Sequence, residues 1–195
     1  MRERLEVFAG SMFSGKTDEV LREIRKAEVA EKVIQAFKTN VDTRTKNKIR
    51  SHSGAEYPAT EVDSSRGILT SLIPGVQLVV IDEAQFFDKE IVDVVEVLLE
   101  SGIQVIANGL PTDFRGEPFG PMPTLLAKAD QIARLQAICT YKDGDGKVCG
   151  DDASRTQRFV DGVPASYHEP IIVIGEKEQY APRCPKHHEV PGKKY

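Results

Sequence analysis

The sequence lacks a long hydrophobic run, an excess of positive charge and any internal repeat or low-complexity segment. A helix that spans a bilayer needs about 20 consecutive apolar residues, and no run in this chain approaches that length. The formal net charge is −4, which gives no reason to expect tight binding to DNA, RNA or an anionic membrane surface. These absences argue against a membrane-spanning protein and against a nucleic-acid-binding protein.

Cysteine is also scarce, with three residues in a chain of 195. The first predicted strand begins almost at Met1, which leaves no room for a signal or transit peptide, so we expect a cytoplasmic protein. Thiols stay reduced in that compartment, and metal ligation or plain burial is then favoured over disulfides. Hydrophobic and charged contents of 40% and 29% are those of a globular protein with one sizeable domain and room for a small appendage.

Residues 10–17 read GSMFSGKT and fit the phosphate-loop pattern GxxxxGK[ST] at every fixed position. The glycines let backbone N–H groups approach phosphate oxygens, Lys16 reaches the β- and γ-phosphates, and the Thr17 hydroxyl can ligate Mg²⁺. A predicted strand at 5–9 precedes the loop and a predicted helix at 17–31 follows it, so the helix dipole faces the anion. The alternative is a chance match in a glycine- and serine-rich turn. The predicted phosphate-binding residues are Gly10, Ser11, Met12, Phe13, Ser14, Gly15, Lys16 and Thr17.

Residues 76–83 form an apolar run that ends in two acids, the usual partner of a phosphate loop. A strand buried on both faces is continuously apolar, and the groups after it emerge at the carboxyl edge, where such sheets bind ligands. Asp82 is predicted to hold Mg²⁺ directly or through water, and Glu83 can serve as a general base. An apolar strand followed by acids is common by itself; its pairing with the phosphate loop favours a nucleotide site.

The remaining pattern alternates strands with helices over residues 1–138 and predicts an α/β domain with a mostly parallel sheet of the P-loop NTPase type, flanked by helices. The basic stretch at 38–50 is interpreted as a surface loop from which Arg44 can close over a nucleotide. The loop at 109–120 carries Phe114 and Phe119, which we interpret as an exposed wall for base stacking, with core packing as the alternative. Further strands are predicted at 33–37, 103–107 and 131–137, and helices at 65–72, 88–100 and 124–128.

Residues 139–195 have a different character, because all the cysteines lie there. A Cys-x-x-His pair at 184–187 and two cysteines separated by nine residues make a Cys₃His set suited to tetrahedral Zn²⁺. The long gap costs about 1 kcal/mol more in loop closure than a short one, against ~10–16 kcal/mol from structural zinc. Unrelated buried cysteines are the alternative, and His188 competes with His187, which the spacing favours. The predicted ligands are Cys139, Cys149, Cys184 and His187.

A β-hairpin is predicted between the two ligand pairs, with strands at 155–160 and 170–174 around a turn at Asp161-Gly162. Both ends of the hairpin would then lie at the metal site. The C-terminal part is therefore predicted to be a small zinc-binding hairpin domain.

Together these motifs resemble the type II thymidine kinases, the cytosolic zinc-containing class, over essentially the whole chain. The resemblance is carried by the phosphate loop, the aromatic loop through Phe114, and the segments DTR at 42–44, DEAQFF at 82–87, RTQR at 155–158 and the tail at 180–187. The phosphate loop alone is shared with many NTPases, whereas the combination is specific. The sequence departs from the family in the long Cys139–Cys149 gap and in Thr45, where an aromatic residue is common.

The resemblance implies transfer of the γ-phosphoryl group of ATP to the 5′-hydroxyl of thymidine, with Mg²⁺ and a structural Zn²⁺. It implies that Glu83 is the general base and that Asp42, Arg44, Asp82 and Gln85 belong to the ATP site. It further implies a hairpin that closes over the base as a lasso, a homotetramer, and inhibition by thymidine triphosphate. The residues that match the thymidine pocket are Met12, Phe86, Phe114, Thr156, Ile171, Gly175 and Tyr180.

Two other classes of function fit parts of the pattern. A zinc-containing P-loop NTPase that acts on nucleic acid would need a basic face, which the acidic balance argues against. A nucleotide sensor that binds without turnover would not need Glu83 beside the metal-binding acid.

Overall fold

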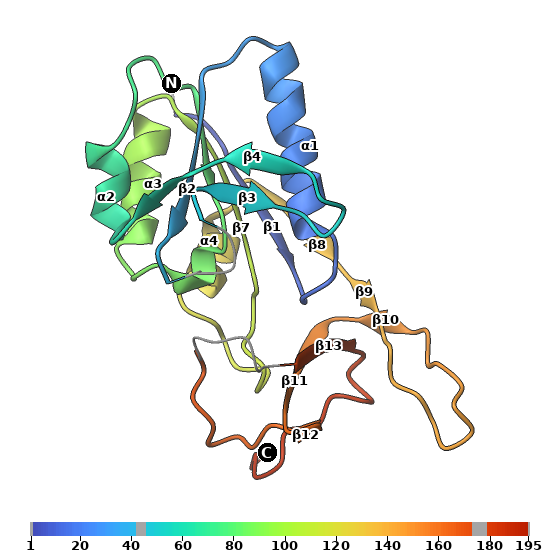
Figure 1. Cartoon of the computed structure of the whole chain (residues 1–195). Helices are drawn as coiled ribbons and strands as arrows, with labels where there is room; N and C mark the ends of the chain where they lie inside the picture. The colour runs from blue at the N-terminus through green and yellow to red at the C-terminus, as the bar shows by residue number, and fades with distance from the viewer. Residues whose placement is uncertain (1, 42–45, 173–178, 195) are drawn as a thin grey trace.

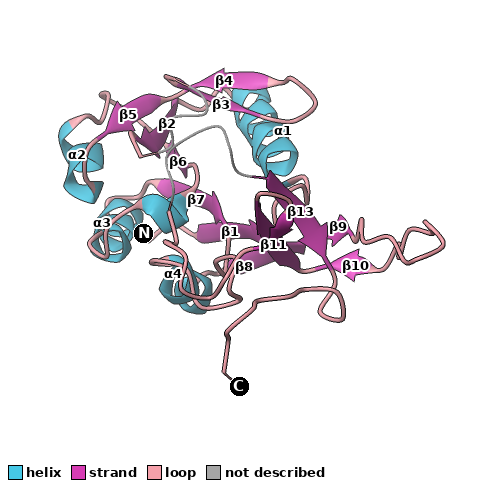
Figure 2. Ribbon diagram, turned by 60° about the horizontal axis from the view of Figure 1, so that its bottom comes forward, coloured by secondary structure: helices cyan, strands magenta, loops and turns pink. Residues whose placement is uncertain are grey.

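The computed structural model of the chain describes residues 2–41, 46–172 and 179–194. Its centre is a six-stranded sheet in the order β5-β2-β6-β7-β1-β8 (Figures 1 and 2). Every pair of neighbouring strands in it is parallel, which confirms the predicted α/β class. The strands are β1 (Leu5–Gly10), β2 (Ile34–Thr39), β5 (Thr60–Val62), β6 (Leu78–Ile81), β7 (Gln104–Gly109) and β8 (Gln131–Leu135).

Helices cover both faces of the sheet, α1 on one and α2, α3 and α4 on the other (Figures 1 and 2). Val7 and Ala9 of β1 pack on the side of α3 and α4, whereas Phe8 between them packs on α1. Because successive strand residues face opposite sides, a sheet covered twice needs apolar residues at every position. The helices are α1 (Lys16–Val29), α2 (Ser65–Thr70), α3 (Ile91–Glu100) and α4 (Met122–Lys128), with a short 3₁₀ helix η1 (Ala84–Phe86). Within the described ranges, no helix has the length and apolar character to cross a bilayer.

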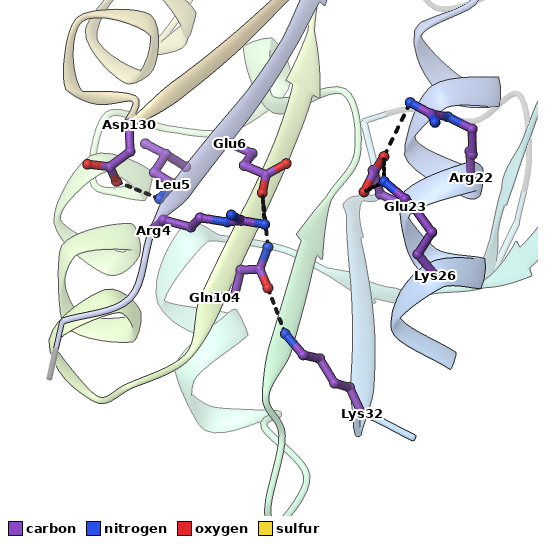
Figure 3. Close-up of polar contacts among 9 residues, drawn as sticks. All are labelled: Arg4, Leu5, Glu6, Arg22, Glu23, Lys26, Lys32, Gln104 and Asp130. Atoms are coloured by element: carbon purple, nitrogen blue, oxygen red, sulfur yellow. Dashed lines mark hydrogen bonds and ion pairs between the residues drawn. The ribbon is translucent and has the colours of Figure 1, made fainter. Parts of the chain in front are cut away.

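Polar contacts join neighbouring elements at the amino-terminal edge of the sheet (Figure 3). The Gln104 amide donates to Glu6 at 3.1 Å and accepts from the Lys32 ammonium at 2.9 Å. The Leu5 N–H donates to the Asp130 carboxylate at 2.8 Å. The buried side chains of Glu6 and Gln104 are therefore hydrogen-bonded at this edge. The opposite, carboxyl edge carries the loops of the predicted site.

The prediction of a surface loop at 38–50 is wrong for the residues of that stretch that the structure describes. Strand β2 continues to Thr39 with Lys38 fully buried, and β3 (Lys48–Arg50) pairs antiparallel with β4 (Glu56–Pro58). This hairpin lies beside α1 (Figure 1), and Ile49 joins the core that α1 forms. Strands of three residues are too short to reveal an alternating pattern, which is why sequence periodicity missed them.

The chain after β8 forms smaller antiparallel sheets that lie below the carboxyl edge in Figure 1. The predicted strand at 155–160 is confirmed, but its predicted partner at 170–174 is wrong, since residues 170–172 are not in a strand and 173–174 lie outside the described part. The predicted turn at Asp161-Gly162 is confirmed, with positive φ at both residues, but the strand that follows it and pairs with β11 is β12. The strands are β9 (Ala137–Ile138), β10 (Asp152–Ala153), β11 (Arg155–Val160), β12 (Val163–Pro164) and β13 (Gln179–Arg183).

Candidate active site

The register of the central strands brings the phosphate loop and the acid pair to the same edge. Ile81 of β6 pairs with Ala107 of β7, and Ala107 pairs with Val7 of β1. The residues that follow each strand therefore lie side by side at the carboxyl edge, as parallel strands require. Asp82 follows Ile81 directly, and the phosphate loop begins at the end of β1.

The phosphate loop has the conformation that its glycines allow. Gly15 and Phe13 have φ of 80° and 65°, and a Cβ on Gly10 would lie 2.2 Å from the Leu135 carbonyl oxygen. Only glycine fits the close approach at residue 10. The Lys16 side chain is 8% exposed and its ammonium donates to the Ser11 carbonyl at 2.8 Å, so its charge lies inside the loop at the start of α1.

Two hydrogen bonds join the phosphate loop to the C-terminal segment. The Met12 N–H donates to Thr156 Oγ1 at 3.0 Å, and the Ser11 hydroxyl donates to the Ala153 carbonyl at 2.8 Å. Met12 and Thr156, both predicted to line the nucleoside pocket, are thus in direct contact. Sequence reasoning placed both near the site but did not predict this bond.

Glu83 has a left-handed backbone, with φ 49° and ψ 50°. Such a conformation costs a non-glycine residue about 1–2 kcal/mol, and side-chain contacts hold it. The Glu83 N–H donates to Asn108 Oδ1 at 3.2 Å, the Gln85 amide donates to the Glu83 carboxylate, and Gln85 Oε1 accepts from the Leu110 N–H at 3.0 Å. Asn108 was missed by sequence reasoning; the available signal is a polar residue at the carboxyl end of a buried strand.

The loop that follows β7 is closely packed against Gln85. A Cβ on Gly109 would lie 2.3 Å from Gln85 Oε1, and a Cβ on Gly120 would lie 2.3 Å from the Gln85 carbonyl oxygen. Phe86 and Phe119 meet edge to face, with ring centroids 5.7 Å apart. The acid pair and this loop therefore form one packed unit.

The predicted exposure of Phe114 and Phe119 is wrong, because their exposed fractions are 4% and 9%. The Arg158 guanidinium covers the Phe114 ring at 5.1 Å from its centroid, and Arg115 lies at 6.0 Å. The Arg158 guanidinium makes a cation–π contact with the Phe114 ring and so covers it from water. A contact between Phe114 and a nucleoside base stays a prediction.

Other predicted site residues lie in the C-terminal segment or outside the described part. Ile171 is 39% exposed, and Tyr180 is partly buried in β13. Asp42, Arg44 and Gly175 lie outside the described residues, as does Thr45.

Lys38, which was predicted in a surface loop, is fully buried on β2. The pairing of Ala36 with Val80 and of Phe37 with Ile81, continued by the Asp82 N–H donating to the Phe37 carbonyl at 2.9 Å, places Lys38 opposite Asp82. Side chains opposite one another in a ladder share a face, so Lys38 brings a positive charge to the face of Asp82.

The predicted metal ligands come together in the structure. The ligand atoms of Cys139, Cys149, Cys184 and His187 all lie within 4.8 Å of one another. His187 Nδ1 is 3.3 Å from Cys184 Sγ and 3.7 Å from Cys139 Sγ, and its ring stacks on Tyr141 with centroids 4.0 Å apart. A tetrahedral ion with bonds of roughly 2.0–2.3 Å fits such spacings, so the set can bind zinc, and the long gap between the first two ligands does not prevent it.

The thiols of this cluster differ in acidity. Burial opposes ionisation of Cys139, but hydrogen bonds from the backbone of Cys184 and Tyr141 and from His187 lower its pKa to about 6. A backbone hydrogen bond from Asp151 favours the Cys149 thiolate, yet burial and the neighbouring Cys139 and Cys184 sulfurs raise its pKa to about 11. Of these two thiols, Cys139 ionises more readily than Cys149, and thiolate is the form that binds metal.

His188 lies outside the ligand set, which settles its competition with His187. Its Nε2 is 2.8 Å from the Phe114 carbonyl oxygen, which can only accept. Burial, helped by the positive charges of Arg155 and Lys193, lowers the pKa of His188, and hydrogen bonds to the backbone of Phe114 and Thr156 act against this.

A comparison with protein families matches the chain to the family model described as thymidine kinase. The match covers residues 3–188, from just before β1 to just past the fourth metal ligand. It therefore spans the phosphate loop, the acid pair, the aromatic loop and the metal cluster together.

Proposed function

Since the chain belongs to the thymidine kinase family, we propose that it transfers the γ-phosphoryl group of ATP to the 5′-hydroxyl of thymidine and of deoxyuridine. The product is the nucleoside 5′-monophosphate of a salvage reaction. The observation that carries the proposal is the hydrogen bond from the Met12 N–H to Thr156 Oγ1 at 3.0 Å. It holds the phosphate loop against the segment that we assign to the nucleoside, so donor and acceptor sites adjoin.

The phosphates of ATP would be held by residues 10–17, whose N–H groups and Lys16 supply positive charge. Thr17 and Asp82 would hold Mg²⁺, which would neutralise the charge that develops on the phosphates during transfer. We assign Asp42 and Arg44 to the same site. Phosphoryl transfer needs alignment and charge neutralisation more than covalent chemistry, and these residues supply both.

Glu83 would accept the proton of the 5′-hydroxyl as it attacks the γ-phosphorus. The contacts from Asn108 and Gln85 support this role, because they hold the backbone and the carboxylate of Glu83 in place. A nucleotide sensor would have no use for a carboxylate held in this way beside the metal-binding acid.

The thymidine base would lie among Met12, Phe86, Phe114, Thr156, Ile171, Gly175 and Tyr180, under the C-terminal lasso. A closed pocket excludes water and so protects ATP from hydrolysis. The Cys₃His cluster offers no open coordination position, so its Zn²⁺ would be structural and would anchor the lasso. Following the resemblance to type II enzymes, we also propose a cytoplasmic homotetramer that thymidine triphosphate inhibits and that binds no nucleic acid.

One assay with γ-labelled ATP and a panel of nucleosides tests the proposal. We expect labelled monophosphate from thymidine and deoxyuridine, and little from deoxyadenosine or deoxyguanosine, because a closed polar site rejects partners that leave its groups unpaired. ATP hydrolysis that depends on added DNA would favour the nucleic-acid NTPase instead. ATP binding without transfer to any nucleoside would favour a sensor.

A further inference from the structure

The residues after the metal cluster form a segment, 188–193, that we call the C-terminal strap. It runs across β11 and reaches the loop that carries Phe114. The strap is fastened to β11 by Gln157, whose side chain accepts from the Glu189 N–H at 2.8 Å and donates to the Glu189 carbonyl at 2.9 Å. The Tyr167 N–H donates to the Pro191 carbonyl at 2.8 Å. Gln157 is 1% exposed, so this fastening is buried.

The same strap holds the aromatic loop through its backbone. The His188 ring donates to the Phe114 carbonyl at 2.8 Å, and the Lys193 ammonium donates to the Arg115 carbonyl at 2.8 Å and pairs with Glu117 at 2.8 Å. A Cβ on Gly116 would lie 3.7 Å from the His188 ring. Strap and loop are thus in close contact over residues 114–117.

The hydrogen bonds within the turn at 113–117 fix its conformation but do not attach it to β11. Asp113 Oδ1 accepts from the Arg115 and Glu117 N–H groups at 2.9 and 3.0 Å, and Asp113 pairs with the Arg115 guanidinium. All of these contacts lie within five residues. The attachment of this turn to β11 comes from the strap and from Arg158 above the Phe114 ring.

His188 occupies the central position in this arrangement. It follows the predicted metal ligand His187 directly, and its Nε2 donates to the Phe114 carbonyl at 2.8 Å. The next residue of the strap, Glu189, is held by Gln157, the neighbour on β11 of Thr156, which accepts from the Met12 N–H of the phosphate loop. The His188 side chain therefore links the aromatic loop that we assign to the nucleoside pocket with the residue predicted to bind the metal.

We propose that His188 is a positioning residue that couples the Cys₃His metal cluster to Phe114 and so sets nucleoside affinity. The metal fixes His187, the adjoining peptide fixes His188, and His188 fixes the backbone of the aromatic loop. The part of this inference that concerns nucleoside rests on the proposed function; the coupling between metal and loop does not.

The test compares His188→Leu, which removes the ring N–H, with His188→Gln, which restores a donor. In His188→Leu we expect a rise in thymidine KM of about tenfold, as for a lost buried hydrogen bond. We expect kcat and ATP KM to stay within about threefold and zinc to stay at one per chain. His188→Gln is expected to recover most of the thymidine KM. Lys186→Ala is the matched control, because it alters an exposed side chain on the other side of His187 and is expected to change none of these values.

A second readout does not depend on enzyme activity. Amide hydrogen exchange of residues 113–117 is expected to be faster in His188→Leu than in the wild type, with zinc bound in both. Chelation of the metal is expected to speed this exchange in the wild type and to have much less effect in His188→Leu. Lys193→Ala serves as a further variant, with a smaller change in the same direction.

Unchanged exchange at 113–117 in His188→Leu overturns the coupling, and so does loss of zinc from that variant, because the effect would then pass through the metal site itself. Altered exchange together with unchanged thymidine KM overturns the role in nucleoside affinity. If the wild type phosphorylates no nucleoside, the proposed function fails, whereas the exchange measurements still decide the coupling.

Discussion

At the scale of single residues, the site depends on groups that orient other groups. Asn108 and Gln85 hold Glu83, and His188 holds the carbonyl of Phe114. The candidate site residues Glu83 and Lys16 and the four residues of the Cys₃His cluster were singled out from sequence, because each belongs to a recognisable motif. Asn108 and His188 were not assigned these roles, since their partners lie 25 and 74 residues away and only the fold brings them together.

The first prediction concerns Glu83→Gln, which keeps the side chain's shape and removes the base. We expect kcat to fall by ~10²–10⁴-fold, the usual contribution of a positioned general base, with ATP affinity largely retained. Steady-state kinetics with thymidine and a direct ATP-binding titration measure both. Turnover within about threefold of the wild type would remove Glu83 from the role of base.

The second prediction concerns Cys149→Ser, at the far end of the long ligand gap. Loss of one thiolate from the closed cluster is expected to lower bound zinc well below one per chain. Thymidine KM is then expected to rise much more than ATP affinity falls, because the phosphate loop belongs to the central sheet. Elemental analysis with the two titrations measures this, and Val148→Ala is a suitable control, since it alters an exposed neighbour. Full zinc occupancy in Cys149→Ser would exclude Cys149 as a ligand.

At the scale of elements, the helices and the longer strands of the central sheet were predicted from sequence, and the shortest strands were not. Helix α1 and strands β1 and β6 carry apolar residues at the periods that helices and buried strands need. Strands β3, β4 and β12 have two or three residues each, and their existence depends on pairing and not on local pattern. The same limit explains why the hairpin partner was placed at 170–174 instead of at β12. Strand β13 is longer, with five residues, but its pairing with β11 joins segments about 25 residues apart and is set by the fold.

The third prediction concerns the aromatic loop as an element, through Gly120→Ala. Gly120 has φ 51°, and an added Cβ would lie 2.3 Å from the Gln85 carbonyl oxygen, a backbone atom that cannot move alone. We expect a loss of about 1–3 kcal/mol in the free energy of unfolding and a raised thymidine KM. Gly144→Ala is the control, because nothing lies within 4 Å of its added Cβ. Equal stability of the two variants in urea would show that the loop is not packed on Gln85 as described.

At the scale of the whole molecule, the larger hydrophobic core and the candidate active site lie in different places. The larger core lies between the sheet and helices α2, α3 and α4, whereas the candidate site lies at the carboxyl edge. The class of fold followed from the order of predicted strands and helices. How the C-terminal sheets sit under that edge could not be predicted, because it depends on contacts such as that between Met12 and Thr156.

The fourth prediction uses this separation. Leu99 is fully buried in the larger core, and Leu99→Ala is expected to cost about 2–5 kcal/mol in the free energy of unfolding. At about 2–4 °C per kcal/mol for a chain of this size, Tm falls measurably in calorimetry, while thymidine KM at 25 °C stays near the wild-type value. Val29→Ala, at a side chain that is 86% exposed, is expected to leave Tm unchanged. If thymidine KM in Leu99→Ala rose as much as in a variant of the nucleoside pocket, the packing of the core and the geometry of the candidate site would be coupled.

The two hydrogen bonds that join the phosphate loop to the C-terminal segment also bear on how the protein is made. Their partners are 142 and 144 residues apart, so a ribosome that adds about 5–20 residues per second needs roughly 7–30 s to supply the second half of each bond. During that interval the emerging chain carries the phosphate loop without the segment to which the loop bonds. Under the proposed function, competence for phosphoryl transfer would therefore arise late in synthesis, and nascent chains that are cut short would bind nucleotide without acting on a nucleoside.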